Sequence, residues 1–303
     1  MATTNWPELD FAQWQKTQAT LHMWTQIVGK TRLGLTPLQN HWWNVPLYVS
    51  ARGLTTSAMP LAGGGVLEVE FDFIAHALRM RRSNGAAVDL PLRAQTVAAF
   101  FAEYKAALKE LDVAVHIWPM PVECAAPVRF DLDEANASYD RDAVERFYKV
   151  LMAADTLFKR FATGFQGKIS PVHFFWGSFD LCVTRFSGRK ASGPPRPDRV
   201  QQEAYSDEVS SAGWWPGNGG LGYAAFYCYA APVPDGLAEK PVRPGGWNAQ
   251  MGEFLLAYEE VRAADDPGQA LLDFLESSYA GCADAAGWDR GALERSIAAA
   301  PPV

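Results

Sequence analysis

The spacing of apolar residues switches between a helical and a strand period along this chain, which leaves few fold classes open. Between residues 10 and 32 the apolar residues recur every three, four or seven positions, which predicts an amphipathic helix. Between residues 66 and 74 the apolar residues alternate with acidic residues, which predicts a strand with one solvent-exposed face. Asn84 and Gly85 then join two segments suited to strands, the pattern of a β-hairpin. The first half is therefore predicted to contain a helix and an antiparallel sheet.

The remaining segments repeat this combination of helices and strands. Further helices are predicted at 96–111, 141–165 and 267–283, with a short one after Asp289, and further strands at 45–52, 113–118, 179–186, 223–231 and 253–258. Residues 187–200 are basic and rich in proline and glycine, which indicates a loop. The fold class predicted is α+β with a largely antiparallel sheet.

The two halves also share an order of short motifs. The matched positions are Gly29-Lys30 with Gly167-Lys168, His41-Trp42-Trp43 with His173-Phe174-Phe175, and Arg52 with Arg185. We interpret the order as an internal duplication, with coincidence as the alternative. The halves would then pack about a pseudo-twofold axis as one compact unit. The predicted boundaries are 1–123 for the first half, 124–140 for a linker and 141–303 for the second half, with an inserted loop at 187–222.

Charge and cysteine content limit the partners and the cellular compartment that we expect. The net charge of −7 makes nucleic acid an unexpected partner. No apolar run approaches twenty residues and the first residues do not resemble a signal peptide, so we expect a cytoplasmic protein with no membrane span. The four cysteines match no zinc-binding spacing and are interpreted as reduced core residues. The sequence leaves the oligomeric state open.

Four blocks of the chain are similar to a bacterial family catalogued only as a domain of unknown function. They are residues 22–30 (HMWTQIVGK), 40–54 (NHWWNVPLYVSARGL), 170–189 (SPVHFFWGSFDLCVTRFSGR) and 203–217 (EAYSDEVSSAGWWPG). The resemblance runs nearly end to end. The resemblance implies relatives of this length but no activity, so it assigns no functional role to any residue.

Familiar catalytic signatures do not point to a reaction. The chain has no HExxH, Walker A, GxSxG or EF-hand pattern. Gly217, Gly219 and Gly222 satisfy GxGxxG but follow two tryptophans and a proline rather than a strand, which favours a flexible loop over a dinucleotide site. Residues 203–211 are interpreted as a capped turn, or alternatively as a lid over a pocket.

The candidate catalytic residues are His41, His173, Asp180 and Glu208. If the two histidines approach one another across the pseudo-twofold axis, they suit general acid/base chemistry, because imidazole titrates near neutral pH. The alternative is that both are hydrogen-bonded core residues. Asp180 interrupts an apolar strand and needs a partner, which we expect to be Lys168, Lys30 or Arg52. A divalent metal is a possible cofactor, with little support from the spacing.

The high aromatic content, with eleven tryptophans, predicts a shaped pocket for a small molecule. Its candidate ligand-binding residues are His22, Trp24, Lys30, Trp42, Trp43, Arg52, Lys168, Phe175, Trp176, Arg185, Tyr205 and Trp214. Three function classes follow. The first is an enzyme acting on an anionic or carbonyl-bearing substrate, the second is a ligand-binding or scaffold protein, with carbohydrate as one possible ligand, and the third is a histidine and carboxylate metalloenzyme.

Overall fold

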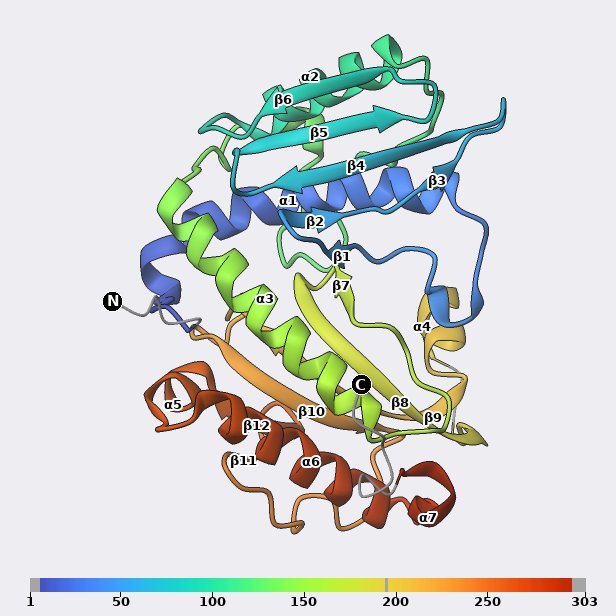
Figure 1. The fold of residues 1–303 in the computed structure, drawn as a ribbon, viewed down its shortest axis with the longest axis vertical. Coiled ribbons are helices and arrows are strands. Elements are labelled where there is room, and N and C mark those ends of the chain that lie inside the picture. Colours follow the sequence, from blue (N-terminus) through green and yellow to red (C-terminus); the bar gives the residue numbers. More distant parts are fainter. Residues whose placement is uncertain (1–5, 194–195, 296–303) are drawn as a thin grey trace, which may run out of the picture.

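The computed structural model describes residues 6–193 and 196–295, and this part of the chain has an α+β fold (Figure 1). The longer helices begin at side-chain caps: Asp10, Thr96, Asp140 and Asp266 each accept a hydrogen bond from a backbone N–H of the first turn. The helices are α1 (Phe11–Leu35), α2 (Val97–Glu110), α3 (Arg141–Thr163), α4 (Arg199–Ala204), α5 (Tyr258–Ala263), α6 (Pro267–Ala285) and α7 (Arg290–Leu293), with 3-10 turns η1 (Asn40–Trp42) and η2 (Phe130–Leu132).

The first half forms an antiparallel sheet. Its strands are β1 (Tyr48–Val49), β2 (Gly53–Thr55), β3 (Met59–Pro60), β4 (Val66–Asp72), β5 (Ala77–Arg82) and β6 (Ala87–Pro91). They are ordered β1-β2-β4-β5-β6, and β3 pairs with β4. Burial alternates along β4, and the turn at Asn84 and Gly85 joins β5 to β6, so the predicted strand and hairpin are confirmed.

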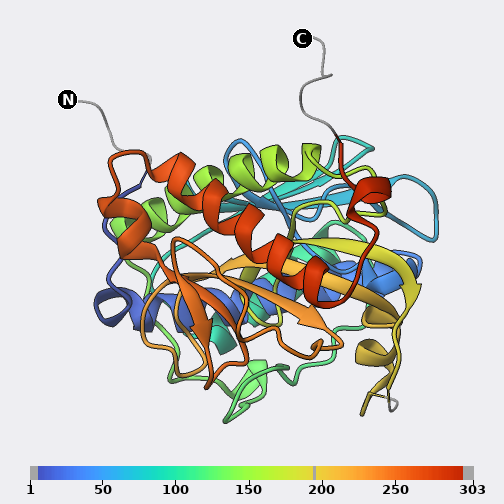
Figure 2. The same ribbon diagram turned by 90° about the horizontal axis from the view of Figure 1, so that it is seen from below.

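The second half forms another antiparallel sheet. Its strands are β7 (His173–Phe175), β8 (Asp180–Lys190), β9 (Asp207–Trp215), β10 (Ala225–Ala231), β11 (Gly246–Asn248) and β12 (Glu253–Ala257). They are ordered β11-β12-β10-β9-β8-β7. Helices α3 and α6 lie across one face of this sheet, as Figures 1 and 2 show, and contact β8, β9 and β10. We call the opposite face the outer face.

The two sheets meet at their first strands. The backbones of Leu47, beside β1, and Phe174, in β7, exchange two hydrogen bonds of 2.9 and 2.8 Å. One continuous hydrophobic core crosses this junction. Phe147 on α3 lies near its centre, with ring contacts to Trp14 of α1 at 5.1 Å and to Trp214 of β9 at 5.8 Å. The halves therefore share their buried side chains.

Several predicted boundaries are wrong. Residues 113–118 are extended but pair with no other described strand, and only Tyr48–Val49 of the segment 45–52 forms a strand. The range 187–222 is not an inserted loop, because it contains the end of β8, α4 and all of β9. Gly29 lies inside α1, whereas its matched residue Gly167 follows the end of α3. The alanine- and proline-rich residues 296–303 lie outside the described residues.

The matched motifs do not occupy equivalent places in the two halves. His41 lies in η1, before the first strand, whereas His173 begins β7. Arg52 lies between β1 and β2, whereas Arg185 lies inside β8. Both halves place a helix before a sheet and further helices after it, but this shared order does not establish a duplication, which stays a prediction.

Candidate functional site

The outer face of the second sheet carries polar and aromatic side chains. Cys182, Gly213 and Tyr227 are neighbours in register across β8, β9 and β10, so all three point to this face. Their sequence neighbours Leu181, Trp214 and Phe226 point to the opposite face and are fully buried. The strand period therefore places these side chains on one side of the sheet and the large core residues on the other.

His41 reaches this face from η1. Its backbone has a left-handed φ of 57°, which costs energy for a residue with a side chain. The ring packs on Phe186 with 4.7 Å between centroids. Nδ1 donates hydrogen bonds to the carbonyl oxygens of Glu203 and Ala204, at 3.1 and 3.2 Å. Because Nδ1 carries a proton in these bonds, the lone pair of neutral His41 is at Nε2.

A lysine and a carboxylate lie at that nitrogen. Lys168 Nζ contacts His41 Nε2 and also donates to Asp207 Oδ2 at 2.9 Å. Asp207 Oδ2 is 3.5 Å from His41 Nε2, and Asp207 Oδ1 accepts from Lys190 Nζ at 2.6 Å. Burial raises the pKa of Asp207, but hydrogen bonds from Lys190 and Lys168 outweigh it and hold the pKa below its usual range. Asp207 is therefore ionised at neutral pH and pairs with both lysines.

Trp43 connects the two predicted histidines. Its ring centroid is 5.5 Å from that of His41 and 6.0 Å from that of His173. Lys168 Nζ lies 5.9 Å from the same indole. His173 also packs edge-on against Phe175 at 5.5 Å. The structure thus brings together five predicted residues, and Trp43 separates the two imidazoles, which make no direct contact.

Asp180 forms a second polar group on the outer face. Its oxygens accept hydrogen bonds from the hydroxyls of Ser178 and Tyr227. Burial raises its pKa, and it makes no ion pair with any described residue, so the predicted cationic partners are wrong. Tyr227 reaches Asp180 by passing over Gly213, where a Cβ would lie 2.3 Å from the phenol.

Three predicted charged residues lie away from His41. Arg52 pairs with Asp72 at 2.5 Å on the first sheet. Arg185 lies on the covered face of the second sheet, 3.4 Å from the ring centroid of Phe161, with Nη2 donating to the carbonyl of that residue. Glu208 pairs with Arg189 at 2.7 Å. A one-residue step along a strand reverses the direction of a side chain, which explains why spacing alone misplaced Arg185 and Glu208.

The predicted residues of α1 belong to the core. Trp24 is fully buried against Phe100. Trp214 on β9, another predicted residue, is fully buried against Phe147. His22 Nε2 donates to the carbonyl of Gly177 at 2.8 Å, and burial lowers its pKa to about 4. Lys30 lies 5.7 Å from the ring of Trp176, whose Nε1 donates to Val45.

The last two predicted residues flank the site. Trp42 lies beside Arg199 of α4, 5.9 Å from ring centroid to guanidinium. Tyr205, which follows α4, pairs its hydroxyl with that of Tyr229 at 3.0 Å on the outer face. Residues 203–211 are neither an isolated capped turn nor a free lid, because β9 begins within them at Asp207.

Sequence reasoning missed Asp207, Lys190 and Tyr227. Asp207, Val209, Ser211 and Gly213 share one face of β9, so the alternation in this segment carried the signal. It was overlooked because serine and glycine give a polar strand little hydrophobic contrast.

The described residues contain no group of three or more histidine, cysteine, aspartate or glutamate side chains that could hold a metal ion. The metalloenzyme alternative therefore finds no ligand set in this part of the chain. In the same part, no helix combines the length and the apolar content needed to cross a membrane.

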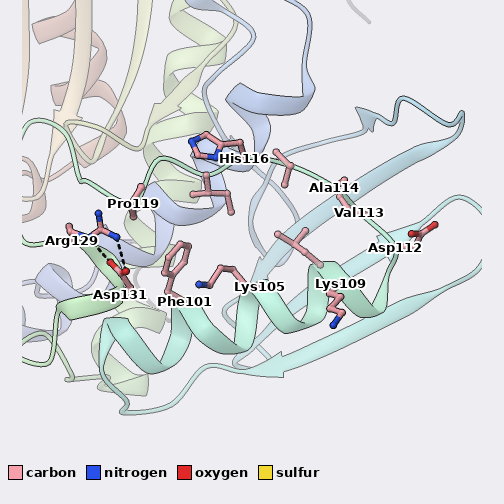
Figure 3. A pocket seen from close by; sticks show the side chains of 13 residues that line it. Phe101, Lys105, Lys109, Asp112, Val113, Ala114, His116, Pro119, Arg129 and Asp131 are labelled. Carbon is pink, nitrogen blue, oxygen red and sulfur yellow. Dashed lines mark hydrogen bonds and ion pairs between the residues drawn. The ribbon is translucent and has the colours of Figure 1, made fainter.

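A cavity of about 890 Å³ lies away from the histidines, between α2 and the extended segment 113–119 (Figure 3). Its walls include Phe101 and Val113, and its rim carries Lys105 and Lys109. None of the predicted site residues lines it. His116 is the one histidine at this groove among the described residues.

Fold and site together define an α+β protein with a histidine, lysine and carboxylate cluster on one face of an antiparallel sheet. Comparison with known families assigns the chain more closely: the family described as "Family of unknown function (DUF5996)" matches residues 6–295, and the chain belongs to it. No curated protein and no solved structure matches the chain.

Proposed function

We propose that this protein is a small-molecule enzyme in which His41 is the acid/base group and Lys168 binds an anionic or carbonyl-bearing substrate. The observation that supports this most is the fixed orientation of His41. Its Nδ1 proton is committed to two backbone carbonyls, so Nε2 is directed at Lys168 and Asp207. A backbone bond that sets the tautomer and orientation of a histidine is a common property of catalytic imidazoles.

His41, Lys168 and Asp207 would each have a role in one proton transfer. Nε2 of neutral His41 takes a proton from the substrate, and the electron pair left behind moves toward an oxygen held by Lys168. The imidazolium that forms lies 3.5 Å from the Asp207 carboxylate, which stabilises it. Lys168 can leave Asp207 for the substrate, because Asp207 then keeps Lys190 as a partner. Return of the proton to another atom of the substrate restores neutral His41.

A second candidate function is ligand binding without turnover. It is supported by the partners that both nitrogens of His41 already have, and by the half-buried aromatic side chains of Trp43, Phe175 and Tyr205. Such side chains stack on ligands with no need for a proton transfer. The two candidates share a site and differ in whether the bound molecule is changed.

We also propose that the protein acts in the cytoplasm on a small molecule, without nucleic acid or membrane as a partner. The net charge of −7 supports the absence of a nucleic-acid surface. All four cysteines are free, and Cys228 lies 4.0 Å from Cys282 in the core, which suits a reducing compartment.

The test is incubation of the protein with a defined mixture of 2-oxo acids, hydroxy acids and phosphate esters, followed by mass spectrometry. We expect the wild type to convert at least one compound, and His41→Gln to slow that conversion by about a hundredfold or more. His76→Gln is the matched control, because His76 is also buried, with positive φ and a glutamate partner at 3.3 Å, but it bonds to Tyr139 and Glu145, away from the His41 cluster. Undiminished conversion by His41→Gln would overturn the assignment, and binding without conversion by the wild type would select the second candidate.

A further inference from the structure

Arg32 is a buried cation that lacks a carboxylate partner. It lies on α1 and is 6% exposed. Nη1 donates to the Thr56 carbonyl and, at 3.3 Å, to Ser57 Oγ, whereas Nε has no hydrogen-bond partner among the described residues. Arg32 forms no salt bridge with a described acid; burial lowers its pKa, and the Tyr48 side chain, through its charge and a hydrogen bond, opposes that shift. Since a guanidinium keeps its proton, the fold contains a positive charge that the described residues do not balance.

His173 has an unpartnered nitrogen close to this cation. The residue is 1% exposed, and its Nε2 bonds to no described atom. Burial, followed by the charge of Arg32, lowers the pKa of His173 to about 3, so the ring is neutral at physiological pH. A neutral imidazole can donate one hydrogen bond to an anion. Buried polar atoms are rarely left without partners, and both of these nitrogens belong to side chains that pack against Tyr48.

Tyr48 joins these two groups. Its ring centroid is 5.3 Å from the Arg32 guanidinium and 5.5 Å from the imidazole of His173. The residue is half-buried and also lines a cavity of about 250 Å³ beside α3. Tyr48 therefore contacts Arg32, His173 and the cavity.

We propose that Arg32 and His173 form a binding subsite for a carboxylate group. A planar carboxylate matches the fork of a guanidinium, places one negative charge against one cation, and leaves an oxygen for the imidazole. The aromatic walls formed by Trp43, Tyr48 and Phe175 suit a small organic acid better than a strongly hydrated phosphate dianion.

The subsite deepens the proposed function and rests on it for its role. Trp43 contacts His173 on one side and His41 on the other. A substrate lying along the indole edge would bind its carboxylate at Arg32 and present its reacting carbonyl or hydroxyl group to His41. The substrate class is therefore a small carboxylic acid with a second oxygen function.

The test uses acetate and inorganic phosphate as probes and calorimetry as the measurement. We expect the wild type to bind acetate more tightly than phosphate, and Arg32→Met to weaken acetate binding by about tenfold or more. Lys30→Met is the matched control, because Lys30 is a buried cation on the same helix that faces Trp176 instead. Its acetate affinity should equal that of the wild type.

Arg32→Met should remain folded, because the substitution removes a buried charge that has no ion-pair partner. If the variant does not fold, nitrogen-15 NMR of the arginine Nε–H groups of the wild type still tests the proposal. The Arg32 signal of the wild type should shift on addition of acetate. An unmoved signal, tighter binding of phosphate, or full acetate affinity in Arg32→Met would each overturn the subsite. His41→Gln distinguishes the two proposals: it should lose turnover and keep acetate binding, so a failure of either can be recognised by itself.

Discussion

The lowered pKa of the buried residue His22 makes folding stability depend on pH. Burial lowers the pKa of His22 to about 4, whereas the same group in the unfolded chain titrates near its ordinary value of 6.5. The unfolded chain therefore binds a proton in this range that the folded protein does not bind. Folding stability from this residue is complete above pH 6.5 and falls as the pH falls toward 4.

We predict that His22 accounts for a loss of about 2 kcal/mol in unfolding free energy between pH 6.5 and 5. Because other groups titrate in the same range, the measurement is the difference between urea unfolding of the wild type and of His22→Gln. The variant should show the shallower decline. His116→Gln, which changes an exposed histidine, should decline like the wild type. Equal slopes for the wild type and His22→Gln would contradict the account.

At the scale of the elements, Gly29 allows α1 to approach the turn between β7 and β8. A Cβ on Gly29 would lie 2.3 Å from the ring of Trp176. That ring is held by its hydrogen bond of 2.8 Å to the Val45 carbonyl. Alanine favours a helix interior by about 1 kcal/mol, but overpacking and the displaced indole cost more.

We predict that Gly29→Ala destabilises the protein by a net amount of about 1–3 kcal/mol, measured by thermal and urea unfolding. Gly63→Ala is the control, because no atom lies within 4 Å of the position where its Cβ would be built. A Gly29→Ala variant as stable as the wild type would show that Trp176 can move aside without cost.

The helices and strands also show which elements can be predicted from sequence patterns alone. Helices α2, α3 and α6 were predicted closely because each combines a helical period with a side-chain cap. Residues 113–118 alternate like a strand yet pair with no described strand, since pairing depends on a neighbour that the local pattern does not specify. Strand β9 was missed because its alternating residues are small and polar.

The site was predictable only in part for the same reason. His41, Lys168, Trp43, Phe175 and His173 do gather, although not through the equivalence proposed for the two halves. For the other predicted residues, the register of the strand and the face on which the side chain lies decide whether it reaches the site. Arg185 points into the covered side of β8, and Asp207 rather than Glu208 points to the outer face. No spacing rule in one sequence fixes those directions.

At the scale of the whole molecule, both halves depend on one core. Phe147 contacts aromatic residues of α1 and of both halves' sheet regions, among them Phe73 at 6.2 Å and Phe174 at 6.4 Å. Removing its ring leaves a cavity that both halves line. A core of this kind favours cooperative unfolding over the independent unfolding of two domains.

We predict that Phe147→Ala lowers the unfolding free energy by about 3–5 kcal/mol and keeps a single transition. Within each protein, tryptophan fluorescence and far-ultraviolet circular dichroism should report one common urea midpoint, and the midpoint of the variant should be the lower. Separate midpoints in the wild type would show that the halves are independent domains.

The measurement that tests the central claim most directly is nitrogen-15 NMR of the five histidine side chains during a titration with pyruvate, which carries both a carboxylate and a carbonyl group. The account predicts that the signals of His41 and His173 shift together, while those of His22, His76 and His116 stay in place. Unmoved His41 and His173 signals, or a shift confined to His116 at the distant groove, would contradict a ligand site around Trp43.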